Sequence, residues 1–284
     1  MRKKSSGCIL IAPLVLGCLV FYLAPFLLVL RFSFSAGSGK SIRLVGLENY
    51  QRILRNESFM LAFGNSLKFF AVGLPLIMVF AYLIALLMQK QADRHKLLKS
   101  VFLFPYIMPV AGTVLLVDLL FSEAGLLNSL LGALGLPAGD WLAGPSAFWV
   151  TIGLYLWKNA GYAVILLLAG LITIPTEQYE SADLDGANTW QRFFYITTPQ
   201  MWYSVFFALV FSVINGFKCF REIFLIGGQE PGDEIYMLQH FINNSFESMN
   251  YASLSVSSIL LLAVILIFFG LFYGFVERKE AYRA

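Results

Sequence analysis

Six long apolar runs dominate this chain of 284 residues. A helix needs about 20 apolar residues to cross ~30 Å of hydrocarbon. The chain is 58% hydrophobic and only 13% charged, whereas soluble domains carry about 25% charged residues. The pattern predicts an all-α, polytopic membrane protein in which residues 1–284 form a single transmembrane domain. The six expected spans cover residues 9–30, 69–88, 101–121, 148–171, 203–220 and 254–275.

The first apolar run allows a second interpretation, because a basic stretch at Arg2, Lys3 and Lys4 precedes it as in a signal peptide. The hydrophobic part of a signal peptide is about 7–15 residues long, and the run at 9–30 is longer. We therefore expect a retained first span.

An even number of spans places both chain ends on the same side of the membrane. Lys and Arg are concentrated on that side, above all in the short loop after the second span, which contains Lys90, Arg94, Lys96 and Lys99. Cytoplasmic loops are enriched in these residues. The bias predicts a multi-pass protein of a bacterial cell membrane with both termini in the cytoplasm, and it places the loop after the fourth span there as well.

That loop, about residues 175–199, has the pattern of a helical hairpin. Pro175 is compatible with the first position of a helix, and Gly186 fits the left-handed residue that closes one. Asn188 and Gln191 have the spacing of a capping box for a second helix, and Pro199 is expected to end that helix.

The polar face of this hairpin allows two interpretations, an interfacial helix on lipid headgroups or a helix that docks onto a protein. Lipid-surface helices favour Lys and Arg, but this segment sets Glu180, Asp183 and Asp185 against Arg192. An anionic leaflet repels such a face. The charges favour a protein partner with a basic groove.

Residues 180–199 resemble the EAA loop of permease subunits of bacterial ATP-binding-cassette importers. The chain differs from that loop at Ser181, where the family has Ala. The residues that match are Glu180, Ala182, Asp185, Gly186, Ala187, Ile196 and Pro199. The resemblance implies that the hairpin is a coupling helix seated on a separate ATP-binding subunit. It assigns this coupling role to Glu180, Ala182, Asp185, Gly186 and Ala187.

The likeness extends from about residue 9 to 275 and favours the carbohydrate-uptake branch, the first permease of the maltose and glycerol-phosphate type. Its further motifs are Val45-Gly46-Leu47-Glu48-Asn49-Tyr50, then Gly125, Asn128, Leu131 and Trp141, then Phe217 to Ile223. The chain departs from the family at 227–231. The resemblance implies the type I importer permease fold, in a chain surrounded by membrane lipid. It also implies three protein partners: two copies of an ATP-binding subunit, a second permease in a heterodimer, and an extracytoplasmic solute-binding protein.

The resemblance also implies a substrate path along spans four and five. Its positions correspond to Tyr155, Lys158, Asn159, Tyr162, Ser212, Gly216 and Cys219. Aromatic and amide groups suit a sugar. A charged residue inside a span usually faces a cavity or a partner, so Lys158 either pairs with Asp118 or extends to the interface. Lys158 also fits an anionic or phosphorylated solute.

Other classes of function lack support in the sequence. A net charge of +3 without a basic block argues against a nucleic-acid partner. Three scattered cysteines (Cys8, Cys18, Cys219) indicate no disulfide framework, and His95 and His240 are too far apart in the topology for a metal site. Residues 37–41 resemble the end of a P-loop, but Phe34 stands where its first Gly is required. We expect no cofactor, no metal and no catalytic site, with ATP hydrolysed by another subunit.

Two alternatives remain at this point. One is the same architecture importing another solute, such as a phosphorylated polyol. The other is a membrane enzyme or scaffold with a partner-docking loop, which predicts a catalytic constellation that the spans do not contain.

Overall fold

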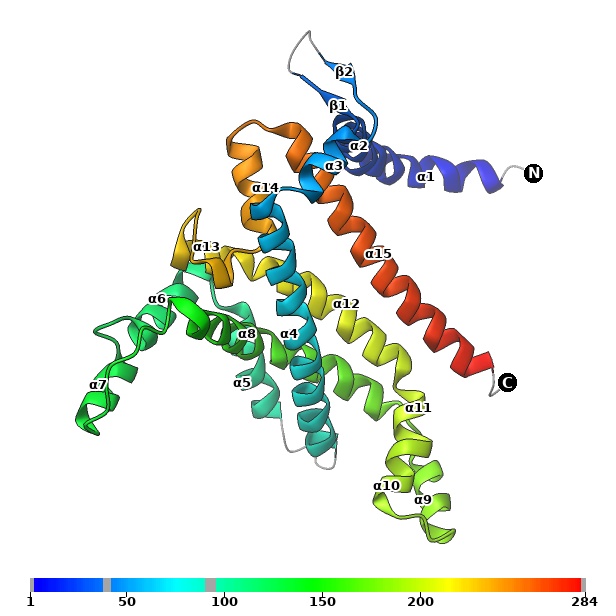
Figure 1. The fold of residues 1–284 in the computed structure, drawn as a ribbon. Helices are drawn as coiled ribbons and strands as arrows, with labels where there is room; N and C mark the ends of the chain where they lie inside the picture. The colour runs from blue at the N-terminus through cyan, green and yellow to red at the C-terminus, as the bar shows by residue number, and fades with distance from the viewer. Residues whose placement is uncertain (1–2, 38–41, 90–95, 282–284) are drawn as a thin grey trace. The chain divides into compact units, whose positions relative to one another are not determined.

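The computed structural model describes residues 3–37, 42–89 and 96–281, and these are mostly helical (Figure 1). Within this described part, six apolar helical stretches are long enough to cross a membrane, which confirms the predicted number. The stretches are Ile11–Ser33, Glu57–Gln89, Val110–Ala133, Gly144–Ile172, Trp202–Gly227 and Tyr251–Gly274. The loop residues Lys90, Arg94 and His95 lie outside the described residues.

The third stretch differs most from its predicted bounds of 101–121. Helix α5 (Lys96–Ile107) ends at a break formed by Met108 and Pro109, and α6 (Val110–Phe121) and α7 (Leu126–Ala133) follow. Pro109 is extended, with ψ of 146°, and caps α6. Proline has no backbone N–H to donate and disfavours a helical conformation in the residue before it, which favours the break at Met108 and Pro109, although α5 continues through Pro105.

The chain divides into two compact units. The first unit comprises Met1–Ala62 and Phe241–Ile267, and the second comprises Phe63–His240 and Phe268–Ala284. The elements of the first unit, or beginning or ending in it, are α1 (Lys3–Cys18), η1 (Leu19–Leu23), α2 (Ala24–Ser33), β1 (Ser35–Ala36), β2 (Arg43–Leu44), α3 (Glu48–Leu54), α4 (Glu57–Gln89), α14 (Leu238–Glu247) and α15 (Tyr251–Ala281).

In the first unit, Asn49 connects α3 to the end of α2. Its buried side-chain amide donates to the carbonyl oxygens of Ser33 at 3.0 Å and Ser35 at 2.8 Å. Tyr50 donates to the Ser33 hydroxyl at 2.9 Å. These bonds satisfy carbonyl groups where α2 stops and the short β1–β2 pair begins, so the segment with Asn49 and Tyr50 has a structural use.

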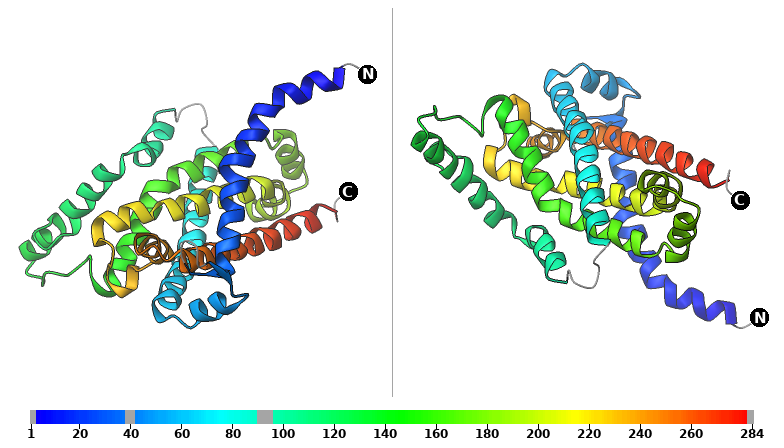
Figure 2. Two further views of the ribbon diagram at one scale, coloured as in Figure 1. Left: turned by 90° about the horizontal axis from the view of Figure 1, so that it is seen from above. Right: turned by 90° about the horizontal axis from the view of Figure 1, so that it is seen from below.

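Helix α8 (Gly144–Ile172) is the most buried of the six apolar stretches, and it is the centre of the second unit. Figure 2 shows α8 alongside α12 (Trp202–Lys218), and α5 also packs on it. Tyr155 and Leu167 of α8 are fully buried in the core with Phe69 of α4. The other elements are α9 (Thr176–Leu184), α10 (Thr189–Arg192), η3 (Phe193–Thr197), α11 (Thr198–Gln200), α13 (Phe220–Gly227) and η4 (Asp233–Ile235).

Helix α8 approaches α5 closely at Gly161. A β-carbon at this position would lie 1.8 Å from the carbonyl oxygen of Phe102. Small residues permit such backbone contact between membrane helices, where packing replaces the hydrophobic effect as the driving force. Gly161 is therefore required by the crossing of these two helices.

The loop around α7 is organised by one buried side chain, Asn128. Its amide oxygen accepts from the backbone N–H of Gly139 at 2.9 Å and from the indole N–H of Trp141 at 2.8 Å. Its amide nitrogen donates to the Gly139 carbonyl at 3.0 Å. Asn128 and Trp141, which belong to the motifs of the family resemblance, are thus part of one hydrogen-bonded loop.

Candidate functional site: a helical hairpin and a polar pocket

In the second unit the hairpin extends from one end, and α13 and the α6–α7 segment lie at the other (Figure 1). Helix α9 closes on Gly186, whose φ of +74° is left-handed. The N–H of Ala187 donates to the Ala182 carbonyl at 2.9 Å, and that of Gly186 to Asp183 at 3.1 Å. These two bonds form a Schellman motif, which confirms the predicted glycine closure.

The second arm begins with the predicted capping box. Asn188 accepts from the N–H of Gln191 at 2.9 Å, and its own N–H donates to the Gln191 side chain at 2.7 Å. This arm ends at Gln200, one residue beyond the predicted Pro199, which lies inside the final turn, α11. The π turn η3 precedes it, and a proline near the start of a helix sacrifices no intrahelical bond.

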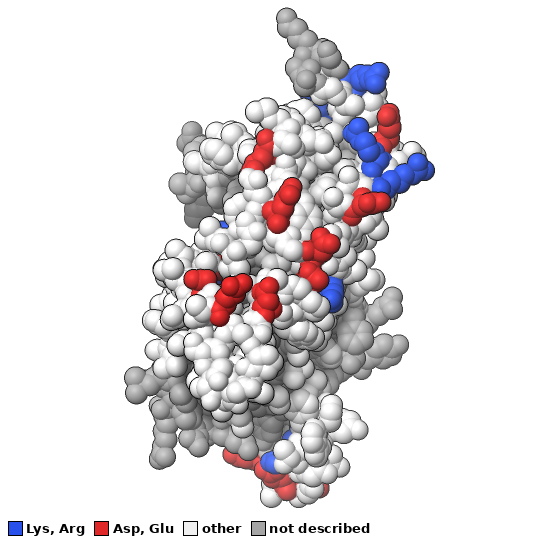
Figure 3. All heavy atoms as spheres, turned by 60° about the vertical axis from the view of Figure 1, so that its left-hand side comes forward, with Lys and Arg blue, Asp and Glu red and all other residues white. Residues whose placement is uncertain are grey.

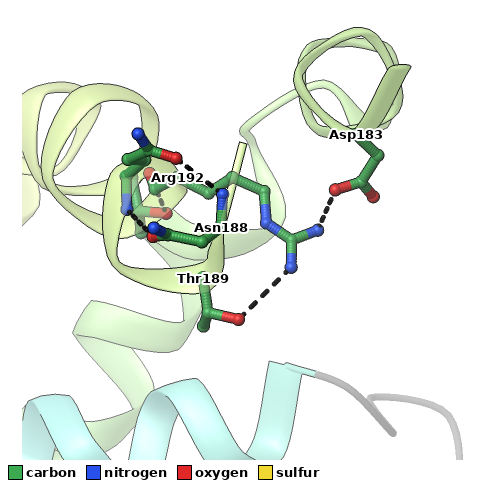
Figure 4. Close-up of polar contacts among 6 residues, drawn as sticks. Asp183, Asn188, Thr189 and Arg192 are labelled. Atoms are coloured by element: carbon green, nitrogen blue, oxygen red, sulfur yellow. Dashed lines mark hydrogen bonds and ion pairs between the residues drawn. The ribbon is translucent and has the colours of Figure 1, made fainter. Parts of the chain in front are cut away.

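Side-chain contacts hold the two arms together. Arg192 forms an ion pair with Asp183 of the first arm and contacts Thr189 within its own arm (Figure 4). Tyr179 and Thr197 share a hydrogen bond of 2.9 Å between their hydroxyl groups. The hairpin is thus braced between its arms near its tip and near its base.

The hairpin exposes large apolar side chains near its tip and along its second arm. Leu184 is 90% exposed, Trp190 71% and Tyr195 79%, and Trp190 stacks on the exposed Phe194 with ring centroids 6.1 Å apart. Among the predicted coupling residues, Glu180, Asp185 and Gly186 are exposed, and Ala182 and Ala187 are half-buried. Exposed apolar groups rimmed by polar ones mark interaction surfaces.

A polar pocket of about 280 Å³ lies within the second unit. Its walls come from the α5–α6 break, the middle of α8, and the junction of α12 with α13 at Cys219. The lining residues are Tyr106, Met108, Pro109, Val110, Lys158, Asn159, Asn215, Lys218, Cys219, Arg221 and Glu222.

Lys158 forms an ion pair with Glu222, and their side chains are only 12% and 3% exposed. The predicted alternatives, pairing with Asp118 or extension to the interface, are both wrong. Asp118 is exposed, whereas α13 brings Glu222 against α8. A buried charge in a membrane helix needs a partner, and the tertiary packing supplies this one.

The structure brings only some of the predicted path residues to the pocket. Lys158, Asn159 and Cys219 line it, and Tyr162 stacks on the lining residue Tyr106 with ring centroids 4.9 Å apart. The other three, Tyr155, Ser212 and Gly216, take part in helix packing. The Tyr155 hydroxyl donates to the Ser212 carbonyl at 2.9 Å. A β-carbon on Gly216 would lie 2.5 Å from the Phe70 ring. Their role in transport stays a prediction.

Sequence reasoning missed Tyr106, Asn215 and Glu222 as pocket residues. Asn215 and Glu222 are seven positions apart, two helical turns, which places them on one face of span five. Glu222 is an acidic residue at the end of an apolar run, but its neighbours Lys218 and Arg221 are typical of a solvated helix terminus.

One face of the second unit carries exposed acidic side chains. Figure 3 shows them on the face that carries α6, α7 and α13, where Glu123, Asp140, Glu230 and Asp233 are exposed. The polar pocket, in contrast, is lined by three cationic residues and one carboxylate.

Comparisons with known proteins agree with one another. The model of a family described as "Binding-protein-dependent transport system inner membrane component" matches residues 59–282. The arabinooligosaccharides transport system permease protein AraP of Bacillus subtilis is 31% identical over 273 residues, which cover 93% of this chain and 86% of AraP. The lactose transport system permease protein LacF of Rhizobium radiobacter is 29% identical over 287 residues, covering 96% and 95%.

Two solved structures share the fold. One is a bacterial ABC transporter involved in the import of the acidic polysaccharide alginate, with a TM-score of 0.82 at 22% identity. The other is the bacterial alginate ABC transporter in complex with an alginate pentasaccharide-bound periplasmic protein, with a TM-score of 0.83 at 20% identity. Each alignment covers 98% of this chain and 96% of the other.

Proposed function

Because the chain belongs to the family of binding-protein-dependent transport system inner membrane components, we propose that it forms half of the path by which an ATP-driven importer moves a sugar or sugar-like solute across the inner membrane. The observation that carries this proposal is the braced hairpin of 175–200 with its exposed tip. Within a permease, such an element suits transmission of force from a separate ATPase.

The hairpin fits a groove in an ATP-binding subunit that is apolar at its centre and basic at its rim. Leu184, Trp190 and Tyr195 supply the buried area, and aromatic side chains of this kind dominate binding at protein interfaces. Glu180 and Asp185 supply charge-assisted hydrogen bonds. We place ATP hydrolysis in that subunit, present in two copies, and not in this chain.

The family supports extending this proposal to the remaining assembly. A second permease completes the path as a heterodimer, and an extracytoplasmic binding protein delivers the solute to the face that carries α6, α7 and α13. Both termini and the hairpin then lie in the cytoplasm, in agreement with the positions of Lys and Arg in the sequence.

The relatives point to saccharides as the transported class, since AraP and LacF are named for arabinooligosaccharides and lactose. A second candidate is an anionic saccharide or a phosphorylated polyol. Lys158, Lys218 and Arg221 in the pocket favour it, and one of the structural neighbours imports an acidic polysaccharide.

The test is reconstitution. The chain is co-expressed with its ATP-binding subunit, the second permease and the binding protein, and the complex is placed in proteoliposomes. ATP-dependent uptake is then measured for a panel of arabinooligosaccharides, lactose, alginate oligosaccharides and a polyol phosphate. We expect uptake of at least one saccharide. A chain that neither recruits an ATP-binding subunit nor supports uptake of any member of the panel would contradict the proposal.

A further inference from the structure

Glu222 combines deep burial with an unsatisfied hydrogen-bonding group. One carboxylate oxygen, Oε1, pairs with Lys158. The other, Oε2, is buried and has no hydrogen-bond partner among the residues that the structure describes. Leaving a buried charged acceptor without a donor is unfavourable, so such a group calls for an explanation.

The surroundings of Glu222 are those of a small-molecule site. The residue lines the polar pocket together with the side chains of Asn159 and Asn215, which are 6% and 5% exposed, and with Tyr106. A pocket of about 280 Å³ lies near the lower end of the ~300–1,000 Å³ typical of ligand sites. This space suits one ring of a saccharide, with amides for its hydroxyl groups and an aromatic ring beside them.

The carboxylate can serve Lys158 and a ligand at the same time. The last torsion of a Glu side chain is broad and roughly two-fold, so the carboxylate can turn without leaving Lys158. Its position also favours adjustment, because two of the helices around it are interrupted there, α5–α6 at Met108 and Pro109 and α12–α13 at Cys219.

We infer that Glu222 contacts the transported saccharide, with one carboxylate oxygen held by Lys158 and the other accepting a hydrogen bond from a sugar hydroxyl. This inference rests on the proposed function and adds a specificity-determining residue to it. An ionised carboxylate only accepts hydrogen bonds, so Glu222 selects solutes that present a hydroxyl donor at this position. It discriminates against those that present an anionic group there.

The test compares the wild-type complex with the double variant Lys158→Gln/Glu222→Gln, which removes both charges together and leaves no unpaired ion in the membrane. Uptake is measured for the saccharide that the wild-type complex transports and for its monodeoxy analogues. We expect the KM of the variant to rise about fivefold to tenfold, because the amide oxygen accepts a neutral hydrogen bond in place of a charge-assisted one, while the maximal rate changes little. One deoxy analogue that is poorly transported by the wild type should lose part of this disadvantage in the variant.

Asp118→Asn is the matched control, because it also converts an intramembrane carboxylate to an amide but lies outside the pocket lining. Its KM and analogue profile should equal those of the wild type. If the double variant also keeps the wild-type KM and analogue profile, Glu222 is only the counter-ion of Lys158 and the inference is overturned.

If the double variant fails to assemble, the charge-reversed pair Lys158→Glu/Glu222→Lys replaces it, since this variant retains an ion pair but moves the acceptor to α8. A raised KM supports the inference, and a wild-type KM overturns it. The proposed function is judged separately: it fails only if the wild-type complex itself transports no saccharide.

Discussion

At the scale of single residues, Gly186 has a conformation that few other residues adopt. Its φ of +74° is accessible to Gly and, at small cost, to Asn. Its N–H also donates to the Asp183 carbonyl. A proline there would fix φ near −65° and remove that donor, so the left-handed backbone and the hydrogen bond to Asp183 would be lost together.

We predict that Gly186→Pro abolishes ATP-driven uptake and leaves membrane insertion intact, because only the exposed hairpin tip is altered. Gly186→Asn, which tolerates a left-handed conformation, should retain most of the uptake. Uptake in proteoliposomes and the amount of chain in the membrane fraction are the two measurements. Normal uptake by the proline variant would remove the basis for a coupling role.

His240 is a buried titratable residue outside the spans. It is 0% exposed, its Nδ1 accepts from the Met237 N–H at 3.1 Å, and the rings of Phe220, Phe224 and Tyr236 surround it. Burial lowers the pKa of His240 from 6.5 to about 4, because charging the imidazole among these rings is unfavourable.

A lowered pKa means that the unfolded chain binds the proton more readily than the folded one. The contribution of neutral His240 to the free energy of unfolding is therefore complete above about pH 6.5 and declines as the pH falls. Near pH 4 this contribution, roughly 3 kcal/mol, is lost. The comparison is with His240→Asn, which keeps an acceptor for Met237 but does not titrate. Thermal unfolding in detergent across this pH range should show a steeper decline for the wild type; coincident profiles would refute the assignment.

At the scale of elements, the hairpin and the spans differ in how directly their sequence predicts them. The glycine closure and the capping box depend on residues three to five positions apart, and both were predicted. The break between α5 and α6 at Met108 and Pro109 was not, because proline permits either a helix start or a helix end. Which of these occurs depends on the turn before it and on what the helix packs against.

The α5–α8 crossing provides a test of element packing. Gly161→Ala places a β-carbon against the Phe102 carbonyl and should destabilise the protein by about 1–3 kcal/mol, as expected for overpacking. Gly153→Ala is the control, because it lies on the same helix with no atom within 4 Å of the added carbon. Thermal unfolding in detergent measures both. Equal stabilities of the two variants would show that the helices adjust without cost.

At the scale of the whole molecule, the proposed orientation places the hairpin and both termini in the cytoplasm. Cysteines introduced singly at Leu184, on the hairpin, and at Leu134, beyond α7, report the two sides, since these residues are 90% and 74% exposed. The natural Cys8, Cys18 and Cys219 are first replaced by Ser. In intact cells without the ATP-binding subunit, an impermeant maleimide should label the Leu134→Cys variant. It should label the Leu184→Cys variant only after the cells are permeabilised. The reverse labelling pattern would show that the protein has the opposite orientation in the membrane.

The sequence by itself determined the membrane-spanning class, the number of spans and the local shape of the hairpin. These properties depend on the length of apolar runs and on contacts between residues close in the chain, which any fold of this sequence would keep. Only the tertiary structure decided that Lys158 pairs with Glu222 and not with Asp118, and which path residues reach the pocket. Residues 64 positions apart meet through the packing of α8 against α12 and α13, and the periodicity of a single helix contains no information on its neighbours.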